Sequence, residues 1–118
     1  MYRSEYAEIA ADDQAEARRN ELAALNLIID QLEAVRAAPG DTSLLHRALD
    51  ATEALWSIFM TDAAHAENAL PRETRQNIIS IARWMFAHSA ALRDGNATGV
   101  DSLIEINKTI RSGLGSKP

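Results

Sequence analysis

The sequence predicts an all-α protein: a small bundle of about four helices with short connections, forming a single domain over residues 1–118. Three observations indicate this fold. Apolar residues recur every three or four positions over long segments, and no segment shows the strict alternation of a half-buried strand. Glycine and proline fall into a few clusters that divide the chain. The length of 118 residues fits one domain of the commonest size.

An N-terminal arm over residues 1–12 precedes the bundle. Its Tyr2, Tyr6 and Ile9 lie four and three residues apart, which suits a short amphipathic helix, and a partly ordered tail is the equal alternative. The first bundle helix is expected over about 13–37. Its core-facing stripe consists of Leu22, Leu25, Ile28, Ile29, Leu32 and Val35.

Pro39-Gly40 ends the first helix, and a second helix is expected over about 42–61. Asp41, Thr42 and Ser43 are all candidate N-caps, because a short side-chain oxygen can accept a hydrogen bond from an unpaired backbone N–H. The apolar stripe of this helix consists of Leu45, Leu49, Thr52, Trp56 and Phe59.

The third helix opens at Pro71, whose fixed φ suits the first helical position, and ends at Arg93-Asp94-Gly95. It is apolar over more than one stripe, which predicts that it is the most enclosed helix. The fourth helix is expected to start with Thr98, with Asp101 as a weak capping-box partner, and to end before a tail over 115–118. Its apolar side is marked by Leu103, Ile106, Ile110 and Leu114.

Composition excludes several classes of protein. The chain has no cysteine, which excludes disulfides, thiolate metal sites and a cysteine nucleophile. A net charge of −5 argues against a protein held on nucleic acid mainly by phosphate contacts. No apolar run approaches the roughly 20 residues of a membrane span. The first residues lack the features of a secretory signal, so we expect a cytoplasmic protein without a membrane segment.

No motif carries recognisable chemistry, so we expect a protein that is not an enzyme and uses no cofactor or metal. Phosphate-binding loops and the GxSxG nucleophile elbow are absent from the sequence. His46, His65 and His88 do not form a pair four residues apart, as a helical metal face requires. His88 falls on an apolar seam, where a hydrogen-bonded core histidine is the more common role.

The basic residues that could act together form three patches of only two charges each: Arg18 with Arg19, Arg72 with Arg75, and Lys108 with Arg111. Helix-dipole or solubility roles explain two charges as well as a nucleic-acid contact does. We therefore do not expect direct nucleic-acid binding.

Large apolar side chains are the best candidates for function. The consecutive Trp84, Met85 and Phe86 span about 200° of a helix, so they cannot all face one narrow core stripe. Interior packing is the default role of such residues, and a groove open to a partner helix is the alternative. The candidate partner-binding residues are Trp56, Phe59, Trp84, Ile104 and Ile110.

Several short segments, taken in their order along the chain, are typical of one known family. They are 30–36 (DQLEAVR), 55–56 (LW), 67–71 (ENALP), 78–84 (IISIARW), 93–95 (RDG) and 103–114 (LIEINKTIRSGL). On these segments the chain resembles the alphaproteobacterial family of FlaF regulators of flagellar biosynthesis, over about residues 2–114.

The resemblance implies a cytoplasmic, non-enzymatic protein that promotes flagellin production and export. Its implied partners are flagellin and a second regulator, FlbT, that acts on flagellin mRNA. The first hypothesis is therefore a flagellin-binding chaperone and regulator of flagellum assembly. The alternative is a post-transcriptional regulator of flagellin translation that acts with FlbT or on the mRNA.

Overall fold

A computed structural model describes residues 2–65 and 67–115 of the chain. Its four helices are α1 (Tyr2–Ala37), α2 (Thr42–Ala64), α3 (Arg72–Arg93) and α4 (Asp101–Gly115). Within the described residues no strand occurs, and short connections join the helices. The predicted small all-α bundle is confirmed.

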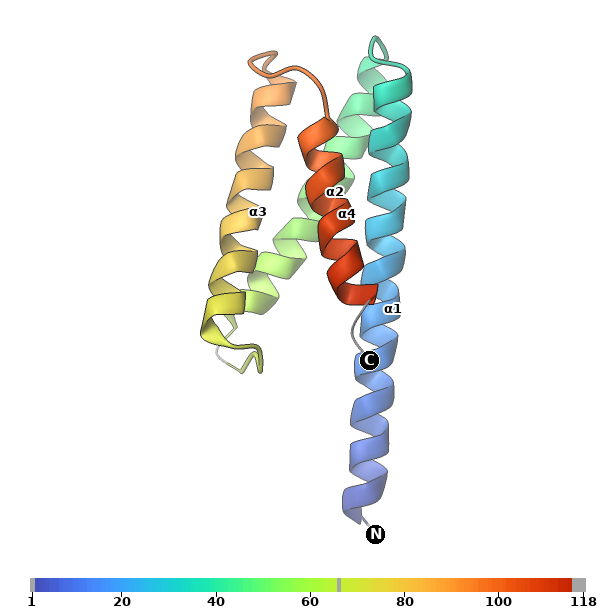
Figure 1. Cartoon of the computed structure of the whole chain (residues 1–118), viewed down its shortest axis with the longest axis vertical. Coiled ribbons are helices and arrows are strands. Elements are labelled where there is room, and N and C mark those ends of the chain that lie inside the picture. Colours follow the sequence, from blue (N-terminus) through green and yellow to red (C-terminus); the bar gives the residue numbers. More distant parts are fainter. Residues whose placement is uncertain (1, 66, 116–118) are drawn as a thin grey trace.

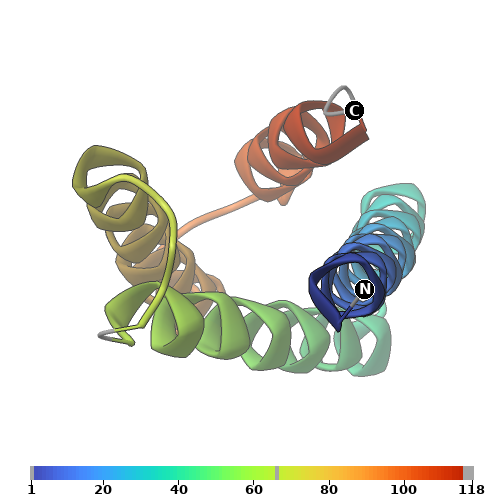
Figure 2. The same ribbon diagram turned by 90° about the horizontal axis from the view of Figure 1, so that it is seen from below.

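The four helices run alternately up and down, so that chain neighbours are antiparallel (Figure 1). α2 crosses diagonally behind α4, from the upper end of α1 to the lower end of α3. Seen end-on in Figure 2, α2 forms one side of the bundle, with α1 and α3 at its two ends. α2 packs on α1 and α3, and α4 packs on α1, whereas the described residues of α3 and α4 form no interface of comparable extent. The bundle is therefore closed on three sides.

α1 differs from the prediction at its N-terminal end. The expected arm is not a separate element, because a single helix runs from Tyr2 to Ala37. At 1.5 Å per residue its 36 residues span about 54 Å, and its first part extends beyond the other helices (Figure 1). The side chains of the arm, residues 1–12, lie outside the described ones, as does the expected tail beyond Gly115.

The other helix ends follow local chemistry. The Asp41 side chain caps α2 by accepting a hydrogen bond from the Leu44 backbone N–H at 3.1 Å, which confirms one of the three candidate caps. Gly95 follows α3 with φ +74°. The predicted start of α4 at Thr98 is wrong, because Gly99 has φ +82° and interrupts the helical backbone.

The core is built from the predicted stripes of the first two helices. Leu25, Ile28, Ile29, Leu32 and Val35 of α1 are buried, as are Leu49, Thr52 and Trp56 of α2. The prediction that the third helix is the most enclosed is wrong. α3 buries one stripe, which consists of Ala82, Met85, Ser89 and Leu92. Its remaining large apolar side chains are only half-buried, and several of them define the site described below.

One polar cluster ties the upper part of α3 to α2. The guanidinium of Arg93 donates to Asp50 at 2.6 Å, to Glu53 at 3.3 Å and to the ring nitrogen of His46 at 2.9 Å. Because Arg93 lies in the last turn of α3, its charge also suits the negative end of the helix dipole. The α2–α3 interface is thus fixed by both apolar packing and a charged cluster.

Candidate functional site

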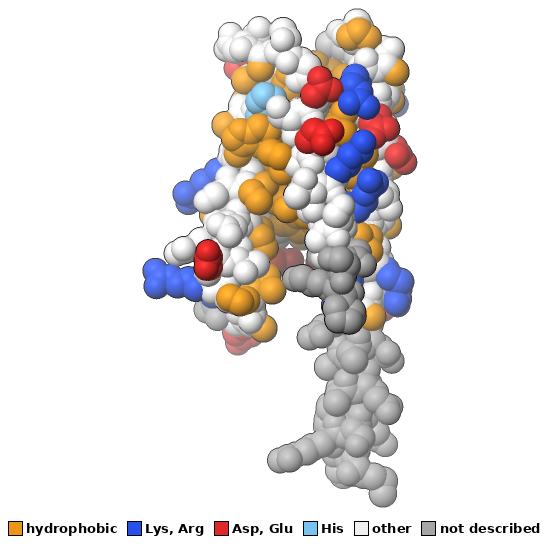
Figure 3. All heavy atoms as spheres, viewed as in Figure 1, with side chains coloured by type: hydrophobic (Ala, Val, Ile, Leu, Met, Phe, Trp, Pro, Cys, Tyr) orange, Lys and Arg blue, Asp and Glu red, His pale blue; other side chains and the backbone are white. Residues whose placement is uncertain are grey.

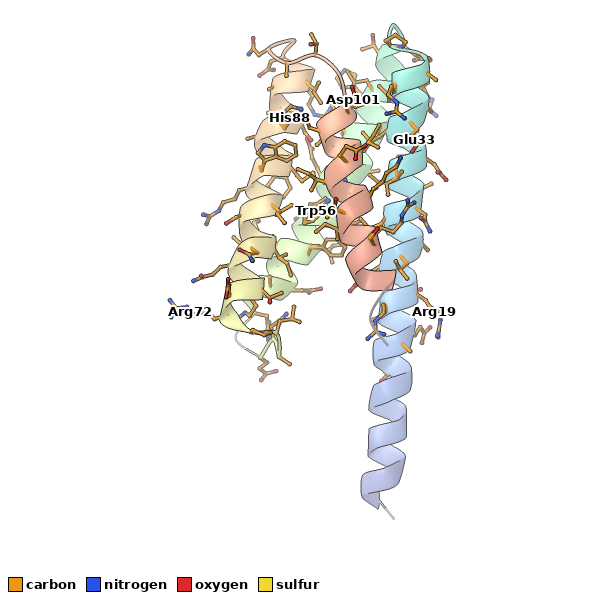
Figure 4. The ribbon with its side chains drawn as sticks, viewed as in Figure 1. Arg19, Glu33, Trp56, Arg72, His88 and Asp101 are labelled. Carbon is orange, nitrogen blue, oxygen red and sulfur yellow. The ribbon has the colours of Figure 1, made fainter. Side chains whose placement is uncertain are left out.

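The two flanks of α4 have opposite chemistry. On the flank that faces α1, three polar pairs follow one another along the antiparallel helices: Arg36–Asp101 at 3.2 Å, Glu33–Lys108 at 3.0 Å and Asn26–Arg111 at 2.9 Å. We call these pairs the polar ladder; Glu33 and Asp101 mark it in Figure 4. The hydrogen bond and charge of Lys108 lower the pKa of Glu33. The chain itself provides the partners on this flank.

The flank of α4 that faces α3 is apolar. Here Ser80, Ile81 and Trp84 of α3 and Ile106 of α4 line a shallow hollow of about 210 Å³, which we call the α3–α4 groove. In Figure 3 hydrophobic side chains gather along this boundary, while charged side chains cover the boundary of α4 with α1. At the upper end of the groove the ring of His88 stacks on Trp84, with centroids 4.9 Å apart and planes 9° apart.

A deeper hollow lies at the lower end of the bundle, where α1 continues past the other helices. We call it the end pocket; its volume is about 390 Å³. All four helices and the α2–α3 connection contribute to it. Its lining consists of Ala17, Arg18, Glu21, Trp56, Phe59, Asp62, Ala63, Asn68, Leu70, Thr74, Ile78 and Ile110. A pocket of this size falls in the range that holds a large apolar side chain or a small ligand.

Hydrogen bonds fix the floor of the end pocket. The indole Nε1–H of Trp56 donates to the Asn107 side-chain oxygen at 2.9 Å, and the Asn107 amide donates to the Leu103 carbonyl at 2.7 Å. The ring of Phe59 meets that of Trp56 edge to face, with centroids 5.1 Å apart. Because a buried indole N–H needs an acceptor, this bond holds α2 and α4 in one register beneath the pocket.

The lower wall of the end pocket is held by the connection between α2 and α3. The Arg75 guanidinium of α3 donates to the Ala63 carbonyl at 2.7 Å and to the His65 carbonyl at 3.1 Å, which satisfies carbonyls at the end of α2. The Asn68 side chain donates to the Asp62 carbonyl at 2.8 Å and accepts from the Leu70 N–H at 2.9 Å. Leu70 is thereby held, 37% exposed, at the pocket mouth.

Charged residues border this apolar pocket. Arg18 and Glu21 come from neighbouring turns of α1, and Asp62 comes from α2. Burial raises the pKa of Glu21, the nearby Asp62 charge adds to that rise, and Arg18 opposes it. The ionised carboxylate of Glu21 is therefore less favourable here than in water.

Four of the five predicted partner-binding residues line these hollows. Trp56, Phe59 and Ile110 line the end pocket, and Trp84 lines the groove. Ile104 is fully buried, and Trp56 is 1% exposed, so both are core side chains, and Trp56 reaches only the floor of the end pocket. Ile104 lies in the lining of neither hollow, and a contact role for any of the five residues stays a prediction.

Sequence reasoning missed other residues of the site. Ile81 and Ile106 line the groove, and neither is among the candidate partner-binding residues chosen from the sequence. The double stripe of the third helix was the available signal, since a helix that buries one stripe leaves the other for a second surface. Asn107 and the Glu21–Asp62 pair carried no sequence signal, because each depends on a contact between helices distant in the chain.

The basic pairs and histidines do not assemble into a site. Arg75, Lys108 and Arg111 contact other parts of the chain. Arg19 and Arg72 lie on opposite sides of the molecule (Figure 4). Among the residues that the structure describes, no group of three or more histidine or acidic side chains is placed to hold a metal ion.

His88 is not the expected enclosed core residue, because it is half-buried at the edge of the groove. Over the described ranges 2–65 and 67–115, no helix is long and apolar enough to cross a membrane.

Comparisons with known proteins agree with the family resemblance. The model of the family described as flagellar protein FlaF matches residues 2–114, which is almost the whole chain and includes every residue of the groove and of the end pocket. No curated protein and no solved structure matches. A family match over this length shows involvement in flagellar function, and the chain belongs to the FlaF family of flagellar proteins.

Proposed function

We propose that this protein is a cytoplasmic, non-enzymatic chaperone that binds flagellin subunits and promotes their synthesis and export. The family supports a flagellar role, and the α3–α4 groove is the observation that supports a binding role. Unassembled flagellin presents amphipathic terminal helices, which need a cover to stay soluble. An apolar groove between two helices is a common receptor for such a helix.

The geometry of the groove suits a helical ligand. On α3, Ile78, Ile81 and Trp84 follow one another at steps of three residues, so they form a continuous apolar edge. On α4, Ile106 and Ile110 form the opposite edge, one turn apart. Ile78 and Ile110, at one end of these edges, also belong to the lining of the end pocket. A helix laid between α3 and α4 would complete the fourth side of the bundle.

Charge supports a protein ligand over RNA. The net charge is −5, and Arg75, Lys108 and Arg111 already contact other parts of the chain. Phosphate binding would have to compete with these contacts. We therefore place regulation of flagellin synthesis downstream of protein binding.

Calorimetric titration of the full chain with flagellin tests this proposal. Trp84→Ala should weaken binding about 30-fold, since a truncated aromatic hot spot typically costs about 2 kcal/mol. Ile58→Ala is the matched control, because Ile58 is 57% exposed and lies outside the groove; its affinity should stay within about twofold of the wild type.

A second variant separates lost binding from lost packing. Ser80 is exposed and lines the groove, so Ser80→Arg places a charge there without removing a core group. Asn77→Arg adds the same charge at an exposed position of α3 outside the groove lining. The proposal requires that only Ser80→Arg weakens binding. Wild-type protein that does not bind flagellin would refute it.

A further inference from the structure

The end pocket has a mainly apolar lining that also contains two acidic residues, Glu21 and Asp62, which we call the acidic rim. Together these features favour a ligand that is both apolar and positively charged. Its floor and sides come from Trp56, Phe59, Ile78 and Ile110. Glu21 and Asp62 lie on its lining from two different helices, close enough for the charge of Asp62 to act on Glu21. Arg18 also borders the pocket, so the lining carries two negative charges against one positive charge.

The acidic rim lowers the stability of the folded protein. A carboxylate beside an apolar cavity loses hydration, and a second carboxylate nearby repels it. The raised pKa of Glu21 reports both effects. A cationic group brought between Glu21 and Asp62 would relieve the repulsion, so the rim favours a positively charged ligand.

The pocket lies next to the groove in which we place the partner helix, because neighbouring turns of α3 and α4 line the two hollows. Ile78 of the pocket precedes Ile81 of the groove by one turn of α3, and Ile110 follows Ile106 by one turn of α4. A helix lying in the groove therefore reaches the end pocket with its next apolar side chain, and a residue three or four positions away reaches the rim.

We propose that the end pocket recognises two residues of a partner helix. One is a large apolar side chain that enters the pocket, and the other is a lysine or arginine, three or four residues away, that lies between Glu21 and Asp62. This inference rests on the proposed function for its natural partner. It adds a sequence requirement to a groove that by itself accepts any amphipathic helix.

Two synthetic amphipathic peptides serve as probes. They are identical except that the residue four positions after a single phenylalanine is lysine in one and glutamate in the other. With the full chain, the lysine peptide should bind about tenfold more tightly, the effect of one partly desolvated charge pair. Methyl NMR signals of Ile78 and Ile110, which line the pocket, should shift on binding, while that of the exposed Ile58 should not.

Two variants test the pocket and the rim separately. Ala17→Phe fills the pocket from an exposed alanine, and should abolish binding of both peptides; Ala23→Phe, at another exposed position of α1, is its control. The double variant Glu21→Gln with Asp62→Asn should remove the tenfold preference, whereas Glu105→Gln, an exposed acid on α4, should keep it.

The outcomes distinguish this inference from the proposed function. If flagellin binds and both pocket variants bind it and the peptides like the wild type, the inference is wrong and the chaperone role stands. If the peptides discriminate while flagellin does not bind, the pocket inference stands and the chaperone role is wrong. Concentration-dependent dimerisation that Ala17→Phe prevents would instead assign the pocket to a second copy, and would overturn the inference.

Discussion

The two flanks of α4 belong to one 15-residue helix, yet one is polar and the other is apolar. Toward α1, the polar ladder pairs each charged or amide group with one from the other helix. Toward α3, Ile81, Trp84 and Ile106 remain half-buried around a hollow. The first flank has its polar partners within the chain, whereas the second leaves apolar side chains partly exposed to solvent.

A small bundle can stay folded with a partly exposed apolar flank on α4 when another face of that helix is buried. The inner face of α4, with Leu103, Ile104 and Asn107, is fully buried. This face supplies the fully buried contacts of α4, whereas the groove and ladder residues on its two flanks stay partly exposed. Substitutions should therefore have large effects on stability at the inner face and small effects at either flank.

The largest expected effect is at Asn107. Asn107→Ala leaves the buried Trp56 indole N–H without its acceptor and opens a small void, so unfolding in urea should show a loss of about 2–3 kcal/mol. Adding Trp56→Phe, which removes the orphaned donor, should make the second substitution less damaging in the Asn107→Ala background than in the wild type. Additive losses would show that the hydrogen bond does not link the two helices.

A smaller effect of opposite sign is expected at Glu21. Its pKa is raised in the folded protein, so folding favours the protonated form and the ionised form lowers stability. Glu21→Gln should therefore raise the melting temperature at pH 7. The gain should shrink as the pH falls through the raised pKa toward the ordinary value of 4.5. A variant that melts lower than the wild type at pH 7 would contradict this account of the rim.

The smallest effect is expected in the polar ladder. Lys108→Gln removes its ion pair with the partly exposed Glu33, and should lower the melting temperature only slightly, with a smaller loss in high salt. Because the pKa of Glu33 is lowered, this contribution is present above the ordinary carboxyl pKa and is lost as the pH falls below it. Flagellin affinity should not change. A marked loss of affinity would show that flagellin binds the flank of α4 that faces α1, which contradicts the proposal.

Much of the fold was predictable because it depends on local patterns. Helical spacing gave the buried stripes of α1 and α2, and the Asp41 cap and Gly95 end follow from residue chemistry near each terminus. The start of α4 was misjudged because a capping pattern at Thr98 is local, whereas the positive φ of Gly99 belongs to the whole connection from α3.

The site was less predictable, because it depends on how far apart two helices sit. Trp84 and Ile104 look alike in sequence, as large apolar residues on helical stripes. Trp84 of α3 lines the groove, whereas Ile104 lies on the inner face of α4 and is fully buried. The spacing of residues along one helix does not encode the separation between two helices.

In the proposed complex, flagellin covers the α3 flank of α4 and leaves the outer surface of α1 free. Hydroxyl-radical footprinting of the full chain, with and without flagellin, tests it directly. Trp84 and Ile106 should be protected in the complex, and Leu27, which is 56% exposed on α1, should be oxidised equally in both samples. Protection of Leu27 with no change at Trp84 would show that flagellin does not bind in the α3–α4 groove.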